Sequence, residues 1–306
     1  MNRPIAALCF AIAALAHSTA FGYCRTTTCA QKDPPKECVP GALVGTCQTA
    51  GTALFWPTSC AAFSVNADGS VAQGISADEL QSLIRLCFDN WQKLPCPNPA
   101  GTNPNILVDT FPQVECSEVR YNKDGPNQNL WIFRDKEWPH DDPTLSMIAL
   151  TSVLFSPSKG EIYDVDVELN SATFLFKAQP ASKGDFRQVT DLQSVIQHES
   201  GHFLGLAHSD VSAATMWAAY GGSSDMRVLK ADDAAGICAA YPPLASGTTN
   251  KACDTTPRHG FSTACAGDSS GCSMANVGSR NATNTRWWMM AFGLVALALR
   301  RTRTRN

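Results

Sequence analysis

Apolar residues recur with two different periods along the central part of the chain, and the two periods predict different elements. From 80 to 94 and again from 192 to 206, apolar positions return every three or four residues, which predicts two amphipathic helices. Shorter apolar or alternating runs predict strands at 105–111, 130–134, 148–155 and 161–169. Helices mixed with strands between residues 53 and 242 indicate a single α/β domain.

Two capping patterns mark where the helices are expected to begin. Ser76 is followed by Glu79 and Thr190 by Gln193, so each pair has the form of a capping box. Asp191 would then lie in the first turn of the second helix, where the helix dipole favours negative charge. We therefore expect helices that start directly after Ser76 and Thr190.

Acidic side chains alternate with apolar ones in the last predicted strand. Asp164, Asp166 and Glu168 therefore share one face. Carboxylate oxygens are ligands that Ca²⁺ prefers, so a calcium site is one interpretation. The other is that they form only the solvated face of an edge strand, and we favour it because such alternation is common in half-exposed strands.

The candidate chemistry lies in the second helix, in the sequence His-Glu-Ser-Gly-His-Phe-Leu-Gly-Leu-Ala-His. His198 and His202 are one helical turn apart and project from one face. Gly205 lets the chain turn, which brings His208 to the same place as a third ligand. Three protein ligands and one open position form a catalytic zinc site, at which Glu199 can act as general base toward a water. A buried helix with merely hydrogen-bonded histidines is the alternative, but it gives the third histidine and the glycine no role.

These residues resemble the metzincin metalloproteases, which share the long histidine motif and a downstream methionine turn. Met216, in the sequence Ala-Thr-Met-Trp, matches that turn. Further residues are similar to the matrixin branch of the family: Ser209, Tyr220, the pair Asp232-Asp233 and the pair Gly236-Ile237.

The resemblance implies a fold, a site and an activity. The fold would be an α/β (α+β) metzincin-type domain with a twisted, mainly parallel sheet, an antiparallel edge strand and a small C-terminal subdomain. Met216 would form a hydrophobic floor under one catalytic Zn²⁺, and Trp217 and Tyr220 would line the substrate pocket. An extended protein or peptide substrate would pair with the 161–169 strand, and zinc-activated water with Glu199 as base would hydrolyse it. We expect the enzyme to be a monomer.

The chain departs from the matrixin pattern in three places. Outside the motif and the two ends, His140 is the one histidine left for the second, structural zinc of matrixins, so that zinc is expected to be missing. Cys38 lies between prolines but lacks the rest of a cysteine switch, and 23–52 is short for a prodomain. Ala218 replaces a proline after the methionine turn.

The N-terminal region predicts export. Arg3, an apolar run at 5–16 and small residues up to Ala20 are typical of a signal peptide, which we place at 1–22. A cysteine-rich segment follows at 23–52. Of the 13 cysteines only Cys9 lies in the leader, and the others imply disulfides formed outside the cytoplasm. The mature protein is therefore expected outside the cell or on its surface.

The C-terminal region predicts a stalk followed by a sorting segment. Residues 243–286 are rich in small polar residues and predict a flexible stalk, in which Cys253 and Cys265 could close a small loop. Residues 287–306 combine a short apolar stretch, expected as a helix, with four arginines. With Cys272, this region resembles the C-terminal sorting segments of myxobacterial surface proteins. A simple membrane anchor is the alternative, and either implies membrane contact before or instead of processing.

The charge distribution and the complete zinc motif reduce the number of functions that the chain could have. All acidic residues lie between 21 and 272 while many basic ones lie at the two ends, so the exported part is acidic and nucleic acid is not expected as a partner. Two other functions compete with the endopeptidase. One is a non-catalytic surface adhesion module on the same fold, and the other is a zinc hydrolase acting on cell-wall peptides. Retention of Glu199 and all three motif histidines favours an enzyme.

Overall fold

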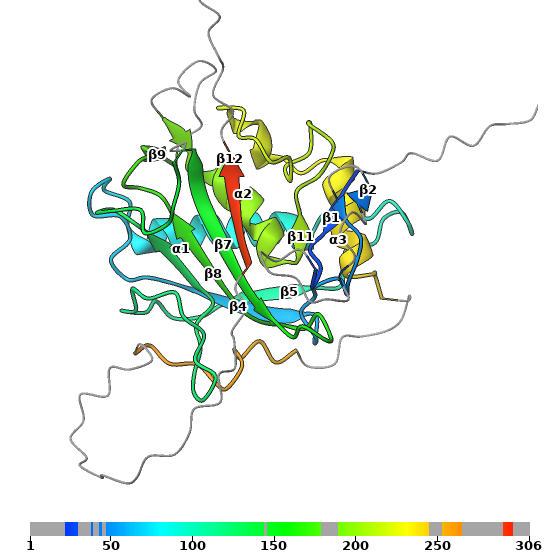
Figure 1. Cartoon of the computed structure of the whole chain (residues 1–306), viewed down its shortest axis with the longest axis horizontal. Coiled ribbons are helices and arrows are strands. Elements are labelled where there is room, and N and C mark those ends of the chain that lie inside the picture. Colours follow the sequence, from blue (N-terminus) through cyan, green and yellow to red (C-terminus); the bar gives the residue numbers. More distant parts are fainter. Residues whose placement is uncertain are drawn as a thin grey trace, which may run out of the picture.

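A twisted sheet with strand order β12-β7-β8-β6-β4-β5 forms the centre of the protein (Figure 1). The computed structural model describes residues 22–29, 38, 43–44, 47–143, 146–178, 189–244, 253–264 and 290–295. The sheet strands are β4 (Cys60–Val65), β5 (Leu107–Thr110), β6 (Leu130–Phe133), β7 (Met147–Phe155), β8 (Ile162–Leu169) and β12 (Met290–Val295). The pairs β4–β5, β4–β6 and β6–β8 are parallel, whereas β7 runs antiparallel to β8 and β12. The mainly parallel α/β class predicted above is confirmed.

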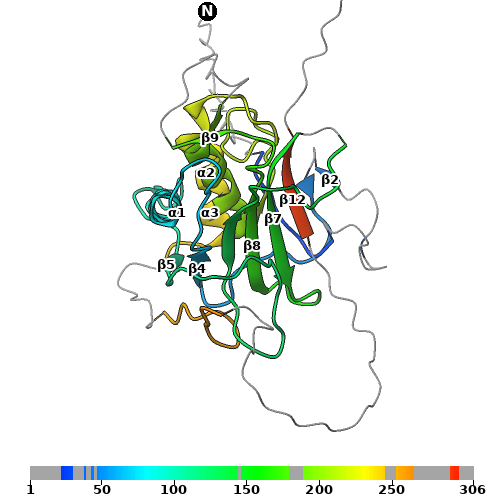
Figure 2. The same ribbon diagram turned by 90° about the vertical axis from the view of Figure 1, so that its left-hand side faces the viewer.

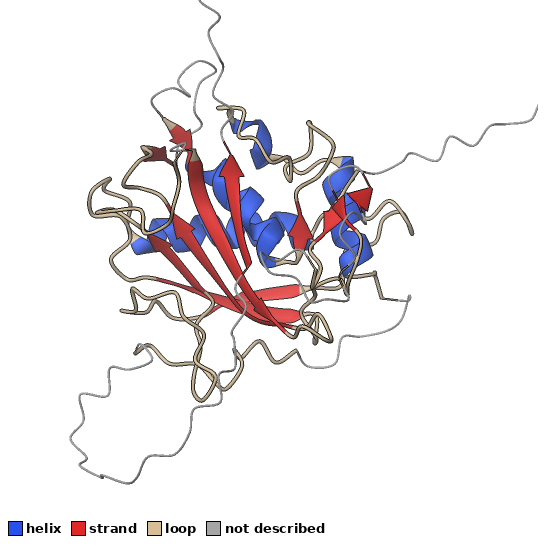
Figure 3. Ribbon diagram, in the orientation of Figure 1, coloured by secondary structure: helices blue, strands red, loops and turns tan. Residues whose placement is uncertain are grey.

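Helices α1 (Ala77–Gln92) and α2 (Leu192–Phe203) cover one face of the sheet (Figures 2 and 3). Phe88 of α1 is the centre of the core between these layers. Its ring lies 5.4 Å from that of Phe63 in β4, 6.1 Å from Trp131 in β6 and 4.9 Å from Phe203 in α2. Trp91 adds a hydrogen bond of 3.0 Å from its Nε1 to the Gln197 carbonyl of α2. Burial of each such ring contributes about 1.5–3 kcal/mol, which fixes α2 against the sheet.

The helix starts agree with the capping patterns in one case and differ by one residue in the other. Ser76 caps α1 by accepting from Glu79 N at 3.1 Å. In α2 the cap is Asp191, which accepts from Ser194 N at 2.8 Å, whereas Thr190 belongs to the short strand β10 (Thr190–Asp191). β10 pairs with β9 (Phe176–Lys177). Because the Asp191 carboxylate is also bound by Arg227 at 2.7 Å, it is held at the helix start.

The expectation that 161–169 forms an edge strand is wrong, because β8 lies between β7 and β6. Its carboxylates are not solvated either, since Asp164, Asp166 and Glu168 are 4%, 7% and 1% exposed. Asp166 accepts from Leu130 N at 2.8 Å, and Glu168 pairs with Arg134 and His140. Alternation alone cannot separate an acidic face that meets water from one that other chain segments cover. In the described part of the chain, the calcium interpretation gains no support, because the one group able to hold a metal is the histidine triad.

A segment of the predicted stalk packs against the sheet next to strands β4 and β5. Residues 253–264, orange in Figure 1, are tied to the domain by a disulfide between Cys253 and Cys60. The Phe261 ring packs 4.9 Å from the Phe111 ring, and Asn127 Nδ2 donates to the Arg258 carbonyl at 2.8 Å. For these residues the stalk prediction is wrong, and so is a loop closed by Cys253 and Cys265. The rest of the stalk, with Cys272, lies outside the described residues.

The N-terminal cysteine-rich segment is attached to the domain by strand pairing, and its own two disulfides lie within it. Strand β1 (Cys24–Arg25) pairs with β11 (Leu206–Ala207), and β2 (Leu43–Val44) pairs with β3 (Cys47–Gln48). Disulfides join Cys24 to Cys47, Cys29 to Cys38 and Cys96 to Cys238. The multiple disulfides agree with the compartment expected from the cysteine count. The predicted leader, apart from Gly22, lies outside the described residues.

The short apolar stretch at the C-terminus is partly described, and there it is not a helix. Residues 290–295 form β12, which adds to the outer edge of β7. Its register places Phe292 opposite Thr151 and Ala291 opposite Ser152. Among the described residues, no helix has the length and apolar character that crossing a membrane would require.

Candidate metal centre

The three motif histidines converge as predicted. His198 and His202 lie on one face of α2, with ring centroids 4.7 Å apart. The chain then turns at Gly205, whose φ is +86°, and β11 leads to His208. His202 Nε2 and His208 Nε2 are 3.3 Å apart, and one ligand atom from each of the three rings lies within 4.8 Å of the others.

Hydrogen bonds orient two of the rings with Nε2 toward the centre. His198 Nδ1 donates to the Thr215 carbonyl at 2.7 Å, and His202 Nδ1 donates to the Leu206 carbonyl at 2.9 Å. Burial lowers the pKa of His198 to about 3 and that of His208 to about 4, so both rings are neutral at physiological pH. A neutral imidazole with its Nδ1–H bound to a carbonyl is the form that ligates a metal through Nε2.

Two unpartnered buried atoms lie at the centre, where a ligand would satisfy them. Among the described residues, the buried atoms His198 Nε2 and Glu199 Oε1 have no hydrogen-bond partner. Leaving such a group unsatisfied costs about 1–3 kcal/mol, so two of them on adjacent residues need an explanation. A Zn²⁺ held by the three histidines, with a water within reach of Glu199, satisfies both. The donor set therefore fits a catalytic zinc ion.

The Glu199 carboxylate is fully buried, and among the described residues only one of its two oxygens is hydrogen-bonded. Its Oε2 accepts a hydrogen bond of 2.5 Å from Thr151 Oγ1 in β7. Burial raises the pKa of Glu199 to about 8 in the metal-free chain, while the bond from Thr151 opposes that rise. The sequence analysis missed Thr151. It could have been noticed from the sequence, because Ala149, Thr151 and Val153 are every second residue of one strand and share a buried face on which Thr151 is polar.

The methionine turn lies against α2, and Asp233 holds it there. Met216 is buried, and a Cβ at Gly201 would overlap its sulfur, so a side chain there would force Met216 to move. Thr215 N and Met216 N donate to the Asp233 carboxylate at 2.9 and 3.1 Å. Asp233 therefore fixes the backbone of Met216, and the buried Met216 side chain packs beside α2, the helix that carries His198.

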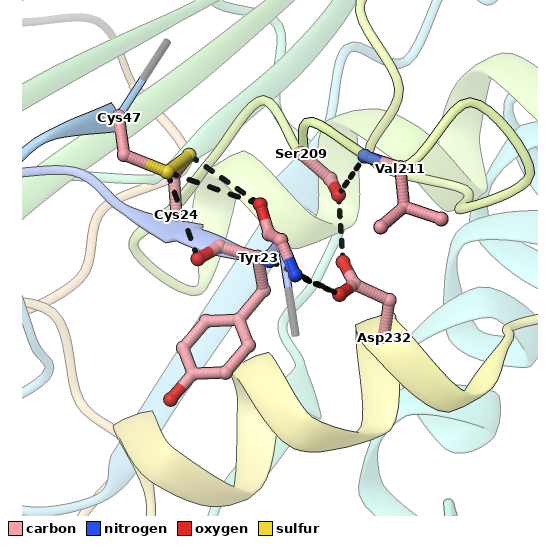
Figure 4. The surroundings of a disulfide bond; sticks show 7 residues. Tyr23, Cys24, Cys47, Ser209, Val211 and Asp232 are labelled. Atoms are coloured by element: carbon pink, nitrogen blue, oxygen red, sulfur yellow. Dashed lines mark hydrogen bonds between the residues drawn. A yellow bond between two sulfur atoms is a disulfide. The ribbon is translucent and has the colours of Figure 1, made fainter. Parts of the chain in front are cut away.

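Asp232, the first residue of the acidic pair, ties the N-terminus of the domain to the segment after His208. Its Oδ2 accepts from Ser209 Oγ at 2.6 Å (Figure 4). Its Oδ1 accepts from Gly22 N at 2.7 Å and Tyr23 N at 3.1 Å, beside the disulfide of Cys24. The third histidine is thus braced by the start of the described chain as well as by β11.

A cavity of about 740 Å³ opens beside the methionine turn. Trp217 and Tyr220 both line it. Tyr220 also accepts from Asp191 N at 2.8 Å, so the wall is anchored to the start of α2. Other lining residues were not anticipated from sequence, namely Ile148 of β7, Phe174, Asp225, Met226 and Lys230.

Comparison with known proteins supports this geometry. Residues 110–242 match the family model described as Matrixin. A stretch of 61 residues is 39% identical to Metalloendoproteinase 1-MMP of Arabidopsis thaliana, and it covers 20% of this chain. The match spans 17% of that relative's length. These similarities support a matrixin-like metalloprotease domain, a family that uses zinc.

Proposed function

We propose that this protein is an exported, zinc-dependent endopeptidase. The observation that carries the proposal is the convergence of His198, His202 and His208 beside Glu199, with His198 Nε2 and Glu199 Oε1 buried and unpartnered. Glu199 is the group that a hydrolase needs and that a purely structural metal site does not. This argues against the adhesion module.

The chain's own residues would divide the work as follows. A bound zinc would acidify a water molecule and polarise a peptide carbonyl. Glu199 Oε1, which has no donor among the described residues, would accept the proton of the attacking water and later deliver it to the amine that leaves. The neutral rings of His198, His202 and His208 would hold the metal, two of them fixed by backbone carbonyls.

The substrate would lie along β7 rather than along β8, which has no free edge. β7 passes the site directly, since Thr151 contacts Glu199 and Ile148 lines the cavity. Its outer edge pairs antiparallel with β12 in this structure, so a substrate peptide would have to displace β12 and take its place. An extended peptide bound by β-augmentation would thus run past Glu199 and place a large apolar side chain between Trp217 and Ile148.

Export and surface sorting remain part of the proposal. The four disulfides between described cysteines support an oxidising compartment. Mass spectrometry of the mature protein would test the leader and Cys272, because it reports both processed ends.

Glu199→Ala tests the chemistry. We expect the purified full-length variant to bind one zinc per chain and to lose at least about 10³-fold in hydrolysis of casein or a peptide library, because the proton acceptor is gone. Hydrolysis by the wild-type protein should be lost with a chelator and restored by zinc. An exposed carboxylate, Glu118, provides the matched control as Glu118→Ala, which should retain full activity.

Two results would contradict the proposal. Full activity of Glu199→Ala would remove Glu199 as the base. Zinc-loaded wild-type protein that hydrolyses no protein or peptide would favour the adhesion module, and release of fragments from peptidoglycan alone would favour a cell-wall hydrolase.

A further inference from the structure

Thr151 makes a hydrogen bond that the fold by itself does not require. Its side chain is fully buried on β7, and its Oγ1 donates to Glu199 Oε2 at 2.5 Å. The two residues are 48 positions apart in sequence and join the sheet to α2. Once the carboxylate is ionised beside a bound zinc, a hydroxyl donor at this distance would make a charge-assisted bond, which is stronger than a neutral one.

The neighbours of Thr151 show that an apolar residue would otherwise fit. Ala149 and Val153, which flank it on the same face of β7, belong to the main hydrophobic core. Val167, its partner across the β8 pairing, belongs to the same core. Burying a hydroxyl here costs free energy unless it is hydrogen-bonded, and valine has nearly the same shape. The side chain of Thr151 is therefore explained by Glu199.

The bond makes the two oxygens of Glu199 different. Oε2 is held by Thr151, while Oε1 has no partner among the described residues. The terminal torsion of a glutamate is broad and roughly two-fold, so an unrestrained carboxylate would exchange its oxygens and sample several orientations. A donor on one oxygen removes that freedom and leaves the other oxygen in a fixed place.

We propose that Thr151 is a positioning residue, which holds the Glu199 carboxylate so that Oε1 alone exchanges the proton during hydrolysis. The inference rests on the proposed function and names Thr151 as a residue that sets the rate of hydrolysis. Misplacement of a reacting group by about 1 Å can cost roughly 10²-fold in rate, so loss of the hydroxyl should be visible in kcat. Because the Thr151 side chain is buried and directed to Glu199, we expect KM to change little.

Thr151→Val and Thr151→Ser test this role in the full-length, zinc-loaded protein. We expect Thr151→Val to lose about 10- to 100-fold in kcat, with KM within about two-fold of wild type and one zinc bound per chain. Thr151→Ser keeps the donor and should recover kcat to within about three-fold. Ser64→Ala, which removes another fully buried hydroxyl in β4, is the control and should leave both constants unchanged.

A second measurement does not depend on turnover. Crystal structures of the zinc-loaded wild type and Thr151→Val should show one orientation of the Glu199 carboxylate in the first and several in the second. The same single orientation in both, or equal kcat in Thr151→Val and wild type, would overturn the proposal, as would Thr151→Ser failing as badly as Thr151→Val. If the zinc-loaded wild type hydrolyses nothing, the proposed function fails, and the two structures still decide whether Thr151 orients Glu199.

Discussion

Gly205 shows how one residue sets the geometry of the metal centre. It has a φ of +86°, and a Cβ there would lie 2.7 Å from the Leu54 carbonyl oxygen. Both the conformation and the contact exclude a side chain. Because the turn at Gly205 joins α2 to the strand that leads to His208, any shift at this glycine moves the third ligand relative to the first two.

Gly205→Ala is expected to weaken zinc binding by at least about ten-fold, because His208 is displaced. Competition with a chromophoric chelator would measure the affinity, and thermal unfolding would measure stability. Gly74→Ala is the matched control. Gly74 also has a positive φ, +67°, but a Cβ there would meet nothing within 4 Å. That variant should lose only about 1 kcal/mol of stability and keep its zinc affinity, whereas equal zinc affinity in both variants would show that Gly205 does not place His208.

The residues of the centre differ in how far sequence could predict them. His198, Glu199, His202 and His208 come from one helix and the turn after it, so their spacing alone determines their meeting. Thr151 lies on a strand far away in sequence, and its contact with Glu199 depends on which strand α2 crosses. Trp217 and Tyr220 were assigned to the substrate pocket by resemblance; they line one cavity, and their role toward substrate stays a prediction.

At the scale of elements, periodicity predicted most helices and strands but missed β4, and it predicted their neighbours poorly. The helix at Ala77–Gln92 and the strands β6, β7 and β8 fall within a residue or two of their predicted ranges. Strand order could not be predicted, because the acidic alternation of β8 has the same appearance whether water or a distant segment covers it. The N-cap of α2 is Asp191 rather than Thr190. Its carboxylate is held in place by Arg227, which is remote in sequence.

The buried Glu168 of β8 provides a test of whether the acidic face of that strand contributes to stability. Burial by itself raises its pKa, but the hydrogen bond from His140 and the charge of Arg134 outweigh burial and hold the pKa below its usual value. A carboxyl with a lowered pKa in the folded state binds fewer protons there than in the unfolded state. Its contribution to stability is therefore present above the unfolded pKa of about 4.3 and is lost as pH falls through the folded value.

Accordingly, Glu168→Gln should reduce the melting temperature at pH 6–7 and reduce its fall between about pH 5 and pH 3. Thermal unfolding followed by circular dichroism across this range would measure both effects. Glu118→Gln, an exposed control, should follow the wild-type curve. A Glu168→Gln curve parallel to wild type would show that the pairs with Arg134 and His140 contribute nothing to acid stability.

On the scale of the whole molecule, both ends of the described chain are attached to the catalytic domain. Gly22 and Tyr23 bond to Asp232, residues 253–264 cover the end of the sheet, and β12 adds to β7. These long-range attachments could not be predicted from local patterns. The short apolar run at 290–295 satisfied the pattern for a helix as well as for a strand, and pairing with β7 decided between them.

Deletion of residues 287–306 is expected to increase the hydrolysis of peptides several-fold, because β12 and an extended substrate would use the same edge of β7. The effect should appear mainly in KM, measured with a fluorogenic peptide library. Deletion of 300–306 alone removes arginines but keeps β12, and it should behave as the full chain does. Equal KM values in the three proteins would show that β12 does not compete with substrate.

The disulfide between Cys60 and Cys253 spans 193 residues and closes the domain into a covalent loop. A protease that cuts the chain anywhere between 244 and 253 would therefore release nothing, because the downstream piece stays attached through sulfur. The two fragments would separate on a gel only after reduction. Separation of the catalytic domain from the C-terminal region thus requires a cut beyond Cys253, and a cut beyond residue 264 would leave the whole 253–264 segment on the catalytic domain.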